Sequence, residues 1–275
     1  MAFEGHPGIT WRVRMAGMIP DWARYRDPVH DVAAPAHMGA YWYQVRREGQ
    51  LPLDERLWVD DPPSSSHPAC LAYYAAQAQG ASTGERYLRR LREAAMLERR
   101  NIAQPAVLAA LARELAMQEL PRFDPAVFLG ALHDPAVAGA FREDLREARW
   151  LEITRFPAVV LRRPRGHRAI LILGHRRFDV LHAAVVEMLG RDEQRSPSPP
   201  DAVGYLERWS SATRWEIATA VELDPAACEE RLTADAGLVD RILRRDLAHA
   251  DDVLLRIAPG WASRVAHDGD PARTC

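Results

Sequence analysis

Lysine is absent from this sequence, asparagine occurs once, and cysteine occurs only three times, at Cys70, Cys228 and Cys275. The cysteines are odd in number and widely separated, with no CxxC pair, which excludes a disulfide framework and a cysteine-rich zinc site. No apolar run reaches membrane-spanning length. The segment Met1–Gly8 also lacks the basic and then apolar pattern of a secretory leader. We therefore expect a reduced, cytoplasmic protein with no membrane partner.

Charge and hydrophobic content indicate a globular protein. Hydrophobic residues make up 48% of the chain and charged residues 27%, and the formal net charge is -2. All 36 basic residues are arginine, whose guanidinium group suits bidentate contacts with carboxylates. This charge balance favours no nucleic-acid partner. The glycines near the start form no phosphate-binding loop, so we expect no cofactor.

The first quarter of the chain predicts one strand and a long loop. Apolar and polar residues alternate over Ile9–Met15, which is typical of a strand with one buried face. The stretch Pro20–Pro63 is rich in proline, aspartate and aromatic residues, with room for one short helix near Gly39–Glu48. Its tryptophans and tyrosines need a packing surface, so we expect this loop to be ordered.

A block of five helices is predicted next. Ser64–Ser66 precede a helix over His67–Gln79, and a second helix covers Gly84–Asn101. Further helices are expected to begin near Pro105, Asp124 and Asp134, where proline and aspartate mark helix starts.

The pattern then changes to strands. Apolar strands are predicted over Pro157–Leu161 and Arg168–Leu173, joined by a turn at Pro164–Gly166 and followed by a helix over Phe178–Leu189. A proline-rich linker lies within residues 191–200. Beyond it, helices at 203–210, 215–221 and 225–236 and a hairpin of 238–242 with 253–257 suggest a winged-helix module.

Five segments resemble bacterial DsbA-family thioredoxin-domain proteins, which include FrnE-like proteins and adaptors of the ClpXP protease: Met15–Trp22, Pro35–Tyr43, Asp61–Cys70, Gly84–Leu88 and Leu97–Ile102. The resemblance covers roughly residues 9–190. It implies an α/β thioredoxin-like fold with an inserted helical subdomain, followed by a small winged-helix-like domain. The expected boundaries are 1–63 and 151–190 for the thioredoxin-like domain, 64–150 for the insertion, 191–200 for the linker, 201–258 for the winged-helix-like domain and 259–275 for the tail.

The resemblance also implies a peptide-binding groove. In this family Pro157 looks like the cis-proline that opens a strand beside the active site, so that Arg155, Phe156 and Pro157 face a bound peptide. The alternative is an ordinary trans proline at a strand start. Asp21 and Trp22 match a Pro-Asp-Trp motif of the family, and we assign them to loop packing beside the groove.

One departure from the family matters more than the match. Family members begin with a strand that leads into a CxxC at a helix N-terminus, and the sequence contains neither. In the thioredoxin topology that strand is central, so we expect either a start upstream of Met1 or another segment in its place. Cys70 is interpreted as a small buried apolar residue. No catalytic residue is therefore assigned.

Three functions follow as hypotheses. The first is a thiol-disulfide oxidoreductase scaffold that is redox-inactive as written. The alternative is a non-catalytic adaptor that binds protein or peptide clients, and the third is a glutathione-dependent transferase or isomerase. The oligomeric state stays open.

Two sharper hypotheses are disfavoured. A DNA-reading role for the C-terminal module conflicts with its twelve acidic residues against seven arginines over residues 201–257. The basic hairpin residues Arg241, Arg244 and Arg245 are interpreted as a solvated turn. His175 and His182 lack a third ligand nearby, so no metal site is expected. His30, His37 and His67 are expected to form structural hydrogen bonds.

Overall fold

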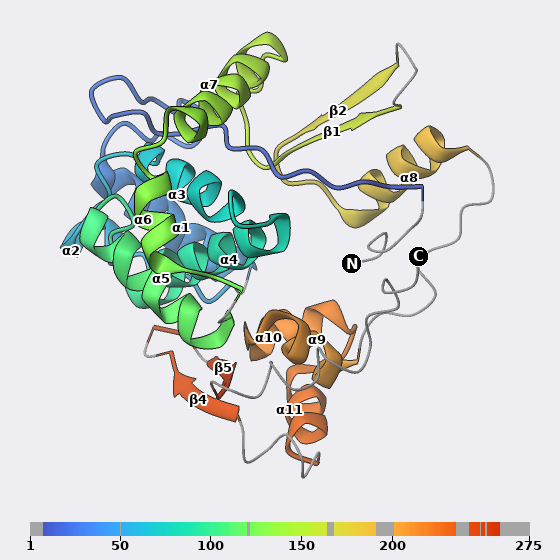
Figure 1. Ribbon diagram of the computed structural model, residues 1–275. Coiled ribbons are helices and arrows are strands. Elements are labelled where there is room, and N and C mark those ends of the chain that lie inside the picture. Colours follow the sequence, from blue (N-terminus) through green and yellow to red (C-terminus); the bar gives the residue numbers. More distant parts are fainter. Residues whose placement is uncertain are drawn as a thin grey trace, which may run out of the picture. The chain divides into compact units, whose positions relative to one another are not determined.

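The computed structural model describes residues 8–49, 51–119, 122–163, 168–190, 201–234, 242–247, 249–250 and 252–258. The chain divides into two compact units, each described by itself below (Figure 1). Unit 1 contains Met1–Ala16 and Arg142–Pro199, and unit 2 contains Gly17–Phe141 and Pro200–Cys275. No helix within the described residues is long and apolar enough to cross a membrane.

Most of unit 2 is a block of helices: α1 (Pro35–Gly49), α2 (Leu57–Asp60), α3 (His67–Gln77), α4 (Ala81–Glu98), α5 (Pro105–Glu119), α6 (Pro125–Ala131) and the first part of α7 (Pro135–Trp150). The predicted starts of α3, α5, α6 and α7 are confirmed, whereas α4 begins at Ala81, three residues before the predicted Gly84. Asp124 and Asp134 accept hydrogen bonds from the backbone amides of Ala126 and Ala136, at 2.7 and 2.8 Å, and so cap α6 and α7.

The segment before α3 is more helical than predicted. The short helix expected at Gly39–Glu48 is in fact α1, which begins at Pro35, and α2 was not predicted. The loop before α1 packs against α1 and α2 through an aromatic cluster, so it is ordered as expected. Ile19, Val32, Met38 and Trp58 form the buried core of this cluster, and Trp22, Tyr25, Tyr41 and Trp42 pack against them.

Helices α3 and α4 pack closely at Gly84, where the absence of a side chain lets α4 approach Gln77 of α3. Gly84 has its Cα so near α3 that a Cβ there would lie 2.8 Å from the Gln77 Cβ. Around this contact the block buries large rings and leucines, each less than 2% exposed, including Tyr73, Tyr87, Phe123, Phe128 and Leu111. The Tyr87 hydroxyl donates to the Leu108 carbonyl at 2.9 Å, which satisfies its polar group in this core.

The C-terminal part of unit 2 contains α9 (Ala202–Trp209), β3 (Ser211–Thr213), α10 (Arg214–Ala220), α11 (Pro225–Ala234), β4 (Ile242–Asp246) and β5 (Val253–Ile257). The antiparallel sheet has the order β3-β5-β4 and covers a core that includes Leu206, Ile217, Leu232 and Leu255. We call residues 201–258 the C-terminal module. Its three helices were predicted. Of the strand expected at 238–242, residues 238–241 lie outside the described residues, and β4 begins at Ile242.

Unit 1 contains the end of α7, the hairpin β1 (Ala158–Arg162) and β2 (Ala169–Leu173), and α8 (Phe178–Leu189). The strands are antiparallel, with Ala158 opposite Leu173 and Arg162 opposite Ala169. The bounds of α8 agree with the prediction, and the hairpin is confirmed. The predicted turn and the proline-rich linker lie outside the described residues.

The predicted strand at Ile9–Met15 is wrong, because these residues form no strand. The backbone amide of Met15 donates instead to the Asp144 carboxylate on α7, at 2.7 Å. The alternation of apolar and polar residues did correctly predict that Met15 is buried. A strand also needs a neighbour to bond, however, and here a helix side chain takes the amide.

Candidate functional site

The segment before β1 is the first part of the candidate site. Arg155, Phe156 and Pro157 are all exposed, with 39% of the Phe156 surface accessible. The Phe156–Pro157 peptide bond is cis, so the prediction of a cis proline is confirmed and the trans alternative is wrong.

A second segment emerges at the same end of the hairpin. The backbone amide of Gly174 donates to the Pro157 carbonyl at 2.8 Å, one step beyond the pairing of Ala158 with Leu173. Gly174 has a φ of +73°, the left-handed region that favours glycine, and this turns the chain out of the sheet toward His175. We call this site, formed by residues 155–157 and 174–178, the hairpin end.

The edge of β1 that does not pair with β2 adds backbone amides and carbonyls to the candidate site. Within the described residues β1 pairs with β2 alone, and α8 packs against β1. Arg163, just past β1, donates from Nε to the Met188 carbonyl of α8 at 2.7 Å, which fixes that end of the strand. An unpaired strand edge offers amides and carbonyls to an extended peptide.

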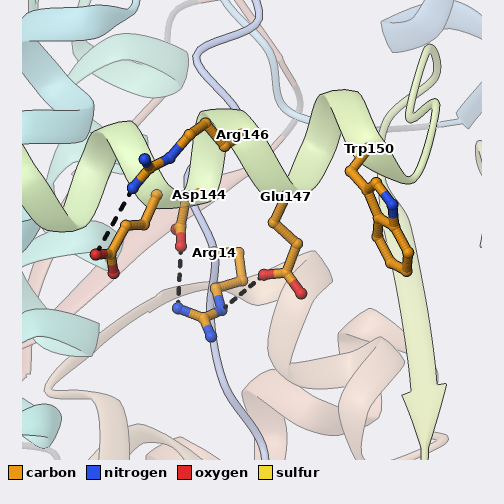
Figure 2. Close-up of a pocket in the computed structure, with 6 residues that line it drawn as sticks. Arg14, Asp144, Arg146, Glu147 and Trp150 are labelled. Carbon is orange, nitrogen blue, oxygen red and sulfur yellow. Dashed lines mark hydrogen bonds and ion pairs between the residues drawn. The ribbon is translucent and has the colours of Figure 1, made fainter.

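A hollow of about 410 Å³ lies between the end of α7 and the N-terminal segment that contains Arg14 (Figure 2). It is lined by Arg14, Glu143, Asp144, Arg146, Glu147 and Trp150. Arg14 donates to Asp144 at 3.0 Å, and its Nε lies 3.6 Å from Glu147. The Asp144 side chain is only 1% exposed. The sequence analysis missed this hollow because carboxylates spaced three apart on a helix are typical of a solvated face.

The charges in the hollow largely neutralise one another, since Glu147 also pairs with Arg162 at 2.7 Å and Arg146 lies 3.8 Å from Glu143. The Trp150 ring, 78% exposed, is the large apolar surface that remains. Within the described residues no group of three or more histidines, cysteines or carboxylates could hold a metal ion.

Asp21 and Trp22 lie in unit 2, whereas Arg155, Phe156 and Pro157 lie in unit 1. The Trp22 indole donates to the Pro63 carbonyl at 2.9 Å and meets Trp58 edge to face at 5.9 Å. Asp21 accepts the backbone amide of Arg24 at 2.9 Å. These contacts hold the loop together.

Two cysteines are described, and both are buried. Cys70 lies in α3, as interpreted from the sequence, and Cys228 lies in α11 with no exposed surface. Burial, with a smaller contribution from Glu229, raises the pKa of the Cys228 thiol. A thiol with a raised pKa is a poor nucleophile at neutral pH, so Cys228 lacks the surroundings of a redox cysteine.

His30 forms the structural hydrogen bond expected from the sequence. Its Nδ1 lies 2.7 Å from the Asp27 carboxylate, and its ring stacks on Tyr41 with centroids 4.4 Å apart. Burial opposes the charge on Asp27, but hydrogen bonds from His30 and Val29 hold the pKa of Asp27 below its ordinary value.

The C-terminal module joins the helical block through charged groups on α4. Arg89 donates to both carboxylate oxygens of Glu216, at 2.8 and 2.9 Å. Glu98 of α4 lies 3.4 Å from Arg245. Within the module itself, Glu229 of α11 lies 2.5 Å from Arg244 of β4. Arg244 and Arg245 are exposed, as expected, but they lie in strand β4 and not in a turn, and both form ion pairs within unit 2. Arg241 lies outside the described residues.

Comparison with known proteins gives a consistent assignment. A family model described as Thioredoxin matches residues 2–183. The chain is similar to the ClpXP adapter protein SpxH of Halalkalibacterium halodurans, with 25% identity over 82% of this chain and 72% of the relative. It is also similar to the ClpXP adapter protein SpxH of Shouchella clausii, with 30% identity over 62% of this chain and 55% of the relative. The chain thus spans about half of one relative and nearly three quarters of the other.

Among solved structures, the chain is similar to the cytosolic disulfide reductase DsbM from Pseudomonas aeruginosa. The identity is 20%, the TM-score is 0.44, and the match covers 58% of this chain and 73% of that one.

Proposed function

Because the chain belongs to the thioredoxin family, we propose that it is a thioredoxin-fold adaptor that binds an extended segment of a client protein and does no redox chemistry as its sequence stands. The observation that carries this proposal is the exposed Phe156, which stands next to Pro157 at the start of β1. In the described residues β1 pairs with β2 alone, and its other edge is where we propose that a client strand adds.

Strand addition and side-chain contacts have different roles in this proposal. Main-chain hydrogen bonds to the edge of β1 supply affinity for any extended segment. Phe156 and Arg155 select among segments, because side chains of the client alternate toward and away from them. Trp150 precedes Arg155 and Phe156 in the same unit and offers a further aromatic contact.

Delivery to a protease is the biological role that we propose for this binding. The relatives described above are named ClpXP adapter proteins, and a site without a thiol pair is compatible with such a role. The client would be held by the hairpin end while a ClpXP-type protease degrades it. Protein or peptide clients are accordingly the proposed partners, and the cytoplasm is the proposed location.

A second candidate is thiol-disulfide exchange, which membership of the thioredoxin family favours. It requires a CxxC that the printed sequence does not contain. A redox role therefore depends on cysteines supplied from outside this sequence. The third hypothesis, a glutathione-dependent transferase or isomerase, has no described residue in its favour.

The domain arrangement is proposed in the same terms. Residues 1–63 and 151–190 form the thioredoxin-like domain, 64–150 the helical insertion, 191–200 the linker and 259–275 the tail. We assign residues 201–258 to a winged-helix-like fold because three helices and a β4–β5 hairpin follow one another in that order. Its arginines pair with carboxylates of unit 2, which favours a structural role over nucleic-acid binding.

Site-specific photo-crosslinking in cells tests the adaptor function. A photoreactive phenylalanine analogue replaces Phe156 in one variant and Met117, an exposed residue of α5, in a matched control. We expect the analogue at position 156 to capture proteins that the analogue at position 117 does not capture. The captured proteins should also accumulate in cells that lack the ClpXP-type protease. Identical sets of captured proteins at the two positions would contradict the proposal.

An insulin-reduction assay separates the second candidate from the first. The protein as printed should produce no turnover above the reductant alone, because it has no thiol pair. Turnover by this sequence would favour the oxidoreductase function instead.

A further inference from the structure

The hairpin end is rich in exposed arginine. Arg155 precedes Pro157, and Arg176 and Arg177 follow Gly174, which is hydrogen-bonded to the Pro157 carbonyl. All three arginines are exposed. The hydrogen bond and the strand register place both segments at one end of the sheet, so a single ligand bound at that end would meet both segments.

These arginines are poorly neutralised. Arg177 lies 3.4 Å from Asp179, with both side chains largely exposed. Within the part of the chain that the structure describes, Arg155 and Arg176 form no ion pair, and Glu152, three residues before Arg155, forms none either. Unscreened guanidinium groups near a binding site attract carboxylates.

The charge of unit 1 as a whole has the same sign. Residues 8–16, 142–163 and 168–190 contain eleven arginines and six carboxylates, although the full chain has 36 basic and 38 acidic residues. Four of those carboxylates pair away from the hairpin end, with Arg14, Arg146, Arg162 and Arg168. Of the seven other arginines, three belong to the hairpin end: Arg155, Arg176 and Arg177.

Exposed apolar side chains accompany the arginines. Phe156, Phe178 and Val180 are 39%, 45% and 47% exposed. Aromatic rings beside guanidinium groups suit a ligand that alternates apolar and anionic groups.

We propose that the hairpin end selects acidic extended peptides, with carboxylates meeting Arg155 and Arg176 and an aromatic or large aliphatic side chain meeting Phe156. This inference rests on the proposed function and names the class of client. A peptide is favoured over a single-stranded nucleic acid because the edge of β1 offers main-chain donors and acceptors to another main chain.

Fluorescence anisotropy with three labelled peptides tests the proposal. The peptides share one length and the same phenylalanines, and differ only in having glutamate, glutamine or arginine at the intervening positions. We expect the full chain to bind the glutamate peptide roughly tenfold more tightly than the glutamine peptide at low salt. High salt should reduce the difference.

Two variants locate the effect. The double variant Arg155→Gln/Arg176→Gln should bind the glutamate peptide about fivefold more weakly and bind the glutamine peptide with unchanged affinity. Arg113→Gln, at an exposed arginine of α5 in unit 2, is the matched control and should change neither.

The outcomes separate this inference from the proposed function. Equal binding of all three peptides would overturn acidic selection and leave the peptide-binding function standing. Binding of none would overturn both. A labelled single-stranded oligonucleotide that binds more tightly than the glutamate peptide would overturn the inference in favour of nucleic acid.

Discussion

Arg256 of β5 donates to the carboxylate of Glu98, at the end of α4, over a distance of 2.7 Å and a sequence separation of 158 residues. The same carboxylate accepts from Arg90 at 2.5 Å, and its side chain is only 7% exposed. One buried carboxylate thus links the helical block to the C-terminal module. Its removal leaves two guanidinium groups without their main partner.

Replacing Glu98 should weaken unit 2 in a pH-dependent way. Burial opposes the charge on Glu98, but Arg90 and then Arg256 hold its pKa below its usual range. A lowered carboxyl pKa contributes stability above the unfolded value near 4.5, and that stability is lost as the pH falls through the folded pKa. We expect Glu98→Gln to cost roughly 2–4 kcal/mol at neutral pH and less below pH 4.5.

Urea unfolding followed by circular dichroism, at neutral and acidic pH, measures this effect. Glu230→Gln, at an exposed position of α11, is the matched control and should stay within about 0.5 kcal/mol of the parent. A Glu98→Gln cost that does not change with pH would contradict the ion-pair explanation.

Two glycine substitutions test the close packing of α3 on α4. Gly84→Ala should destabilise the protein by about 1–3 kcal/mol, because the added methyl group meets the Gln77 Cβ at 2.8 Å. Gly130→Ala, in α6, meets no atom within 4 Å and should be neutral or stabilising by up to about 1 kcal/mol. Thermal unfolding of both variants measures the difference, and equal costs would contradict the packing argument.

The elements marked by local chemistry were predictable from the sequence. Asp124 and Asp134 cap the helices that follow them, and an apolar run with a helix-length pattern gave the bounds of α8. Elements that depend on distant partners were not. β3 has three residues and exists because it pairs with β5, which no local pattern reveals.

The candidate site divides in the same way. Family resemblance pointed to Phe156 and Pro157 and implied the cis bond, which the residues alone did not indicate. The hollow around Arg14 and Asp144 was not foreseen, because the two residues are 130 positions apart. The ion pairs that connect α4 with the C-terminal module were not foreseen either, because an arginine-rich helix is typical of a solvent-exposed face when only the sequence is considered.

The carboxylate of Asp144 should hold the N-terminal segment of unit 1, which contains Arg14 and Met15, against α7. This buried carboxylate accepts the Met15 amide at 2.7 Å and the Arg14 guanidinium at 3.0 Å. Asp144→Asn keeps the shape but removes the charge, so we expect the Met15 amide to exchange with solvent about tenfold faster. Glu143→Gln, at a 72% exposed position of the same helix, is the control. Unchanged exchange in Asp144→Asn would show that the charge does not hold this segment.

Thiol labelling tests whether the cysteines are inert. Cys70 and Cys228 are both buried, and burial raises the pKa of the Cys228 thiol, so less thiolate is present at a given pH. In a Cys275→Ser variant, iodoacetamide should modify both on the order of a hundredfold more slowly in the native protein than in urea. Native labelling at the unfolded rate, located by peptide mass spectrometry, would identify an accessible thiol. It would also reopen a redox role for the position that reacts.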